Sequence, residues 1–130
     1  MTPKPFLDST LILRVTLFVI LITHSIPGMF NGGVQSFGED YLNTVGFAPL
    51  GVPLAWAIKL SHVVCAVALL IRRYVLVAAI ITIVILIMGI ILVHYPEGWF
   101  VVGGGRNGVE YNVLLISVLF YLMLAERNKD

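Results

Sequence analysis

Lys59 and His62 lie three residues apart within an apolar stretch of the chain. Residues at this spacing share one face of a helix, and Trp56 lies one turn earlier on the same face. An ammonium and an imidazole can donate hydrogen bonds to a ligand oxygen, and an indole can stack on a planar ring. This spacing therefore predicts a small polar binding site inside an apolar segment.

An ammonium in an apolar segment requires a counter-charge, because an unpaired charge away from water costs several kcal/mol. Glu110 is the only carboxylate within a predicted span. We therefore expect a Lys59–Glu110 interaction, direct or through water, with the histidines at its border. Glu110 also aligns with Leu114, Ser117 and Tyr121, and we expect this polar-tinged stripe to face inward.

The elements that carry these residues are predicted to span a membrane. Hydrophobic residues make up 59% of the 130-residue chain and charged residues only 12%, with a mean hydropathy of +1.00. Residues 74–93 contain no charged side chain, and this run is as long as a bilayer core requires. The composition predicts an integral membrane protein.

The apolar runs predict an all-α, four-helix, up-down bundle that forms a single transmembrane domain over residues 1–130. The spans are expected at about 10–30, 53–71, 74–94 and 109–125. The connection 31–53 places Val34, Phe37, Tyr41, Leu42 and Val45 near one helical face, which predicts a short interfacial helix. The first run could instead be a cleaved signal peptide, but Arg14 in its core and the lack of a small-residue cleavage site favour a retained span.

Basic residues indicate the orientation in a cell inner (plasma) membrane. Lys4, the turn Arg72–Arg73, Arg127 and Lys129 predict that both termini and the second connection are cytoplasmic. The ionisable residues His24, Lys59, His62, His94 and Glu110 then gather in the outer half, and only Arg14 lies in the inner half. This predicts a polar pocket that opens outward and is lined by His24, Trp56, Lys59, His62, His94, Arg106, Glu110 and Tyr121.

Several of these residues also fit purely structural roles. Arg14 is expected to be a structural, inner-half charge that extends towards the inner headgroups. Histidines near the interface, such as His24 and His94, need only a hydrogen bond. A Lys59–Glu110 pair could serve only to fix the register of two helices.

The sequence pattern argues against disulfide exchange, metal binding and dinucleotide binding. Cys65 is the only cysteine, which excludes a disulfide relay within the chain. No two ligands on one helix have metal-binding spacing, so no metal site is expected. Gly103, Gly105 and Gly108 match a dinucleotide fingerprint, but no strand can precede and follow them, so they predict a permissive turn instead. No catalytic residue is identified, and nucleic acid is not an expected partner.

The order of several motifs resembles the DoxX family of small four-helix bacterial membrane proteins. The motifs are an arginine early in the first span, HSIPG at its outer end, GFAPLGVP, and GGGRNGVEYNVLL at the start of the last span. The resemblance implies association with membrane oxidoreductases or sulfur and oxidative-stress handling, with Arg14, His24 and Glu110 at matching positions. Members often carry a glutamate in the second span, where this chain has His62.

These features favour a redox-associated subunit that binds a quinone or a similar small molecule in the outer pocket. A partner subunit of a membrane oxidoreductase would have to supply the electron carrier. A non-catalytic assembly or anchoring subunit and a small proton-coupled transporter are the alternatives. Beyond the lipid bilayer, a second copy of the chain is a further candidate partner.

Overall fold

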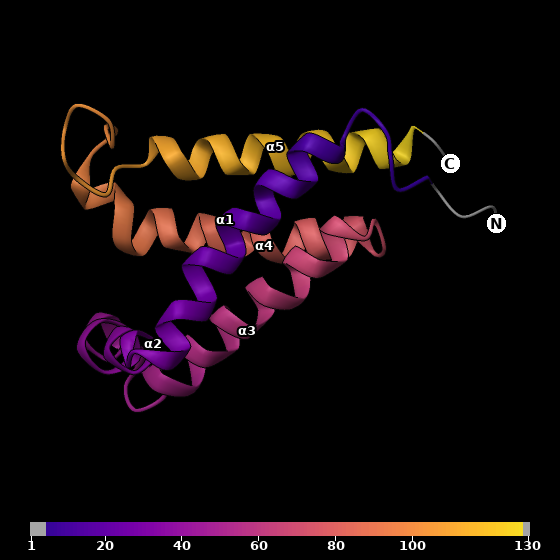
Figure 1. The fold of residues 1–130 in the computed structure, drawn as a ribbon. Helices are drawn as coiled ribbons and strands as arrows, with labels where there is room; N and C mark the ends of the chain where they lie inside the picture. The colour runs from indigo at the N-terminus through magenta and orange to yellow at the C-terminus, as the bar shows by residue number, and fades with distance from the viewer. Residues whose placement is uncertain (1–4, 129–130) are drawn as a thin grey trace. The chain divides into compact units, whose positions relative to one another are not determined.

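The chain folds into α-helices, and the computed structural model describes residues 5–128. The elements in chain order are α1 (Leu11–Phe30), α2 (Gly33–Ser36), the π-helix η1 (Phe37–Phe47), α3 (Gly51–Leu70), α4 (Val75–Gly89), the π-helix η2 (Ile90–His94), the 3₁₀-helix η3 (Tyr95–Glu97) and α5 (Glu110–Arg127) (Figure 1). No β-strand occurs in the described range. The all-α prediction is confirmed.

Three segments are long and apolar enough to cross a membrane: Leu11–Phe30, Gly51–Leu70 and Val75–Glu97. They coincide with the first three predicted spans. The fourth predicted span coincides with α5, which carries Glu110, Glu126 and Arg127 within its 18 residues and is not among the three. A fourth crossing therefore stays a prediction.

The exposed surface of α4 is apolar. Leu76, Val77, Ile80, Ile81, Val84, Ile87 and Met88 are each at least 40% exposed. A water-soluble protein rarely exposes so continuous an apolar surface, whereas lipid solvates it well. The surface supports a membrane environment for this helix.

The structure divides into two compact units, Met1–Arg73 and Tyr74–Asp130. The bundle arrangement of all four long helices and the single-domain organisation remain predictions.

In the first unit, α1 and α3 pack against each other in antiparallel directions (Figure 1). Arg14 near the start of α1 donates to the carbonyl of Leu70 at the end of α3, and Lys59 donates to the carbonyl of His24. From one bond to the other the chain advances ten residues along α1 and recedes eleven along α3. The two hydrogen bonds therefore mark one antiparallel register.

Arg14 is completely buried and is bonded to the protein rather than extended towards headgroups. Its Nη1 donates to the Leu70 carbonyl at 2.6 Å, and its Nε donates to Thr10 Oγ1 at 3.1 Å. Its Nη2 donates to the Phe6 carbonyl and to Asp8 Oδ1, the latter at 3.3 Å. The expected extension of Arg14 towards the inner headgroups is wrong, because Asp8 and three other oxygens surround the guanidinium within the unit.

Asp8 is also the counter-ion of a second arginine. Arg72 Nη1 lies 3.0 Å from Asp8 Oδ2 and donates to the Pro5 carbonyl at 2.7 Å. Asp8 Oδ1 further accepts from the backbone N–H of Thr10 at 3.0 Å, immediately before α1. One carboxylate thus joins the N-terminal segment, the start of α1 and the turn after α3; we call Asp8, Arg14 and Arg72 the arginine clamp.

The first connection is helical, as predicted. Val34 in α2 and Leu42 in η1 are buried and form a core with Ala55 of α3, whereas Val45 is 38% exposed. Asn43 Oδ1 accepts from the N–H of Gly51 at 2.9 Å, which satisfies a free donor at the start of α3.

Close backbone contact between η1 and α3 depends on two glycines. A Cβ on Gly38 would lie 2.5 Å from Val52 Cα, and one on Gly51 would lie 2.2 Å from the Gly38 carbonyl oxygen. Both distances are far shorter than a normal contact, so any larger residue would force η1 away from α3.

In the second unit, α4 and α5 lie side by side (Figure 1). Asn112 Nδ2 of α5 donates to the Leu86 carbonyl of α4 at 3.1 Å. The buried residues of α5 are Asn112, Leu115, Leu119 and Leu122. The expectation that the stripe of Glu110, Leu114, Ser117 and Tyr121 faces inward is wrong, since Leu114 and Tyr121 are 60% and 52% exposed.

Asp8→Ala is expected to destabilise the protein by about 3 kcal/mol, because it leaves the buried guanidinium of Arg14 without a counter-ion. The measurement is unfolding by denaturant in a nonionic detergent. Glu97→Ala is the matched control: it removes the exposed Arg106–Glu97 ion pair (2.7 Å) and should cost less than about 1 kcal/mol. Equal losses in the two variants would contradict a stabilising role for the clamp.

Candidate functional site

Lys59 is the only lysine within the three candidate spans. It lies about 12 Å along α3 from Gly51, at about 1.5 Å of rise per residue. Its Nζ donates to the His24 carbonyl at 3.1 Å and lies 5.5 Å from the centre of the Phe37 ring. Both partners are neutral, and none of the described carboxylates in its unit forms an ion pair with it. Within its unit the ammonium is held in place without a counter-charge.

His62 lies one turn beyond Lys59 and is 8% exposed. Its Nδ1 has no hydrogen-bond partner among the described residues, and neither has Oγ of the fully buried Ser25. A buried polar atom without a partner costs about 1–3 kcal/mol. Ser25 follows His24, whose carbonyl accepts from Lys59, so both atoms belong to residues within one turn of the Lys59–His24 bond.

His24, Lys59 and His62 form a group of nitrogen bases on α1 and α3. Lys59 is close enough to both imidazoles to interact with them electrostatically. His24 is exposed, Lys59 is half-buried and His62 is buried. We call these three residues the basic cluster; three of the predicted pocket residues are thus brought together within one unit.

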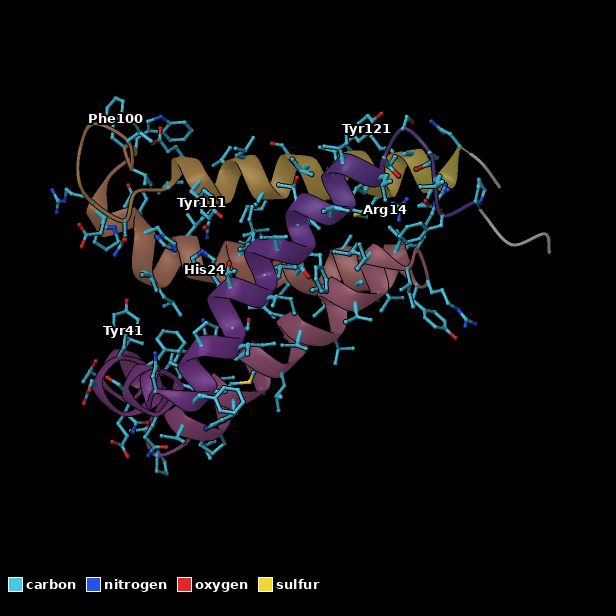
Figure 2. All side chains as sticks on the ribbon, viewed as in Figure 1. Arg14, His24, Tyr41, Phe100, Tyr111 and Tyr121 are labelled. Carbon is cyan, nitrogen blue, oxygen red and sulfur yellow. The ribbon has the colours of Figure 1, made fainter. Side chains whose placement is uncertain are left out.

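Aromatic side chains of η1 lie beside this cluster. Phe37, which contacts the Lys59 ammonium, is stacked with Tyr41 at a centroid distance of 5.9 Å and an interplanar angle of 7°. Figure 2 shows Tyr41 on η1, at the opposite end of α1 from Arg14. Trp56 packs against the core of Val34, Leu42 and Ala55, so it helps to hold η1 on α3.

Phe37, Tyr41 and Ser25 are not among the predicted site residues. Phe37 and Tyr41 were assigned to the apolar face of the connecting helix. The sequence does show two aromatic residues four positions apart on one helical face, just before the span that contains Lys59. This pattern could have indicated an aromatic surface near the lysine. Nothing in the sequence marked Ser25.

A shallow apolar depression lies elsewhere on the first unit. It has a volume of about 600 Å³ and is lined by Gly46, Phe47, Ala48, Leu50, Pro53 and Leu54. None of these is a predicted pocket residue, and none offers a charged group.

The other predicted residues belong to the second unit, around the loop between η3 and α5. His94 Nδ1 donates to the Asn107 carbonyl at 2.7 Å. Arg106 donates to Glu97 Oε2 at 2.7 Å on the exposed surface. Tyr121 is exposed on α5, far along the helix from the loop that carries Phe100 (Figure 2).

Glu110 binds the backbone of the glycine-rich loop. Its Oε1 accepts from the N–H of Val101 at 2.7 Å and of Val102 at 2.9 Å. These two backbone N–H groups hold the carboxylate oxygen at the start of α5. The loop therefore cradles a carboxylate of its own chain.

The glycine pattern has the predicted permissive role. Gly103 and Gly105 have φ values of 81° and 64°, which side-chain-bearing residues rarely adopt. A Cβ on Gly108 would lie 2.4 Å from the Trp99 carbonyl oxygen. The glycines let the loop fold back until Glu110 N donates to the Trp99 carbonyl at 3.0 Å.

The predicted Lys59–Glu110 pair joins the two units and stays a prediction. Within its own unit, Glu110 is bound by the two amides, and Lys59 by a carbonyl and a ring. Among residues 5–128, no three His, Cys, Asp or Glu side chains are grouped as a metal site.

Comparison of the sequence and the fold with protein families, characterised proteins and solved structures found no match.

Glu110→Gln is expected to loosen the loop, because a neutral amide accepts hydrogen bonds more weakly than a carboxylate. Hydrogen exchange at Val101 and Val102 should accelerate by about tenfold.

Glu126→Gln, at the other end of α5, is the control and should leave exchange in the loop unchanged. Equal protection of the two amides in Glu110→Gln and the parent protein would contradict this role.

Proposed function

We propose that the chain is a multi-pass protein of the cell inner membrane that binds a quinone, or a similar small molecule with an acceptor oxygen, at the basic cluster. The observation that carries the proposal is Lys59: an ammonium in a candidate span, fixed by a carbonyl and an aromatic ring and left without a carboxylate in its unit. Its remaining N–H groups are suitable donors to a ligand carbonyl.

Neighbouring groups support a planar ligand with a polar edge. His62 Nδ1 is a second group without a partner, and in its protonated form it donates a hydrogen bond. The stacked rings of Phe37 and Tyr41 offer an aromatic surface beside the ammonium. A pre-positioned ammonium and imidazole would hydrogen-bond a quinone oxygen and supply protons as it is reduced.

Electron transfer would depend on a partner subunit with a flavin, haem or cluster. Such a role agrees with the resemblance to the DoxX family, which itself remains a hypothesis. The assembly role requires a co-purifying partner, and the transporter role requires proton-coupled solute flux.

The proposed topology has four crossings, with α5 as the fourth and both termini cytoplasmic. Residues 111–125 carry no Asp, Glu, Lys or Arg, and the 18 residues of α5 extend about 27 Å, close to the thickness of a bilayer core. Of the basic residues behind this orientation, Lys4 and Lys129 lie outside the described residues, while Arg72 belongs to the arginine clamp.

Single cysteines test the topology in a Cys65→Ser background. In intact cells, an impermeant maleimide should label Gln35→Cys and Val102→Cys but should label Asn128→Cys only after permeabilisation. Labelling of both Val102→Cys and Asn128→Cys from outside would mean that α5 does not cross the membrane. Labelling of Asn128→Cys alone from outside would invert the orientation.

Binding is tested with decylubiquinone, a neutral quinone, on protein in nanodiscs. The chain has two tryptophans, so a Trp99→Phe background isolates the fluorescence of Trp56, one turn from Lys59. Quinone should quench this fluorescence, and Lys59→Gln should weaken binding about tenfold or more, because it removes a charged donor. Arg127→Gln removes an exposed charge at the end of α5 and should leave the affinity unchanged.

No saturable quenching, or equal affinities in Lys59→Gln and Arg127→Gln, would remove the basic cluster as a quinone site. Retention of a co-purifying partner by Lys59→Gln in that case would favour the assembly role. Proton-coupled solute flux in proteoliposomes that Glu110→Gln abolishes would favour the transporter.

A further inference from the structure

Arg14 of α1 and Lys59 of α3 have different charge partners. Arg14 has a carboxylate, Asp8, at 3.3 Å, together with the Leu70 carbonyl and other oxygens. Lys59 has one carbonyl and one aromatic ring, and neither carries a charge. The charge of Arg14 is therefore neutralised within this unit, whereas Lys59 has no carboxylate partner within it.

The surroundings of Lys59 supply no negative charge. His24 and His62 are both close enough to interact with it electrostatically, and both are bases. The described carboxylates of η1, Glu39 and Asp40, accept hydrogen bonds from Gln35 and Ser36 of α2 instead. A site with three bases and no acid favours an anion.

The body of such a ligand would meet apolar side chains. The Phe37 ring lies 5.5 Å from the Lys59 ammonium, and it stacks with the ring of Tyr41. Only a ligand with one charged end and an apolar remainder matches both features.

We infer that the basic cluster selects an amphipathic monoanion, with the oxyanion on Lys59 and His62 and an apolar body against the rings of Phe37 and Tyr41. This inference rests on the proposed ligand site and narrows it: the preferred ligand is an acid, such as an ionised hydroxyquinone or a long-chain carboxylate, rather than a neutral quinone. Lys59 provides the charge, and His62 Nδ1 provides a directed hydrogen bond.

A matched pair of ligands tests the charge alone. 2-Hydroxy-3-alkyl-1,4-naphthoquinone is an anion at neutral pH, and its 2-methoxy ether is neutral with the same ring and chain. Titration of nanodisc-embedded protein, with Trp56 fluorescence as readout and empty nanodiscs as the partition control, should give at least about tenfold tighter binding of the hydroxy compound.

Variants assign the preference to Lys59. Lys59→Gln should abolish the difference between the two ligands, and Lys59→Arg should retain it, because the guanidinium keeps the charge. Arg127→Gln should retain it fully. If Lys59→Gln does not fold, the ligand pair on the parent protein and on Lys59→Arg still decides the outcome.

A second pair, dodecanoate and its methyl ester, distinguishes the source of the oxyanion. Binding of dodecanoate but of neither naphthoquinone would support the anion site and remove the quinone from the proposed function. Equal affinities for hydroxy and methoxy compounds would overturn the inference and leave quinone binding intact. Binding of none of the four ligands would overturn both.

Discussion

The carboxylate of Asp8 is the interaction on which the first unit depends. It is the counter-ion of Arg14, which is completely buried, and of Arg72 at the turn after α3. Removal of one partner of a buried pair costs more than the pair itself contributes, since the remaining charge cannot reach water. The N-terminal segment, α1 and the end of α3 are therefore constrained by a single side chain.

Arg14 and Lys59 differ in how many partners their own unit provides. The guanidinium of Arg14 is surrounded by oxygens of its own unit, so little of its hydrogen-bonding capacity remains. The ammonium of Lys59 has one acceptor and one ring. An intramembrane charge is a site candidate by default, and of these two charges only that of Arg14 is paired with a carboxylate of its own unit.

Periodicity and composition predicted the helices well, because long apolar runs leave a membrane-embedded backbone few alternatives. The same reasoning placed the inner face of α5 on Leu114 and Tyr121, about one residue from the buried Leu115 and Leu122. The prediction followed the polarity of the side chains, whereas packing determines which face is buried. Asn112, a polar residue, faces α4 because its amide reaches the Leu86 carbonyl. The partners of Arg14 and Glu110 are backbone groups distant in sequence, and no spacing rule identifies them.

The register of α1 against α3 links the arginine clamp with the basic cluster. The Arg14–Leu70 and Lys59–His24 bonds lie ten residues apart on α1 and eleven on α3, so they satisfy one antiparallel alignment. A slide of α3 by one turn would move Lys59 about 5 Å from the His24 carbonyl, and it would also break the contact of Arg14 with Leu70. The contact of Arg14 with Leu70 at one end of the helix pair thus fixes the position of Lys59, which has no carboxylate partner within this unit, further along the same pair.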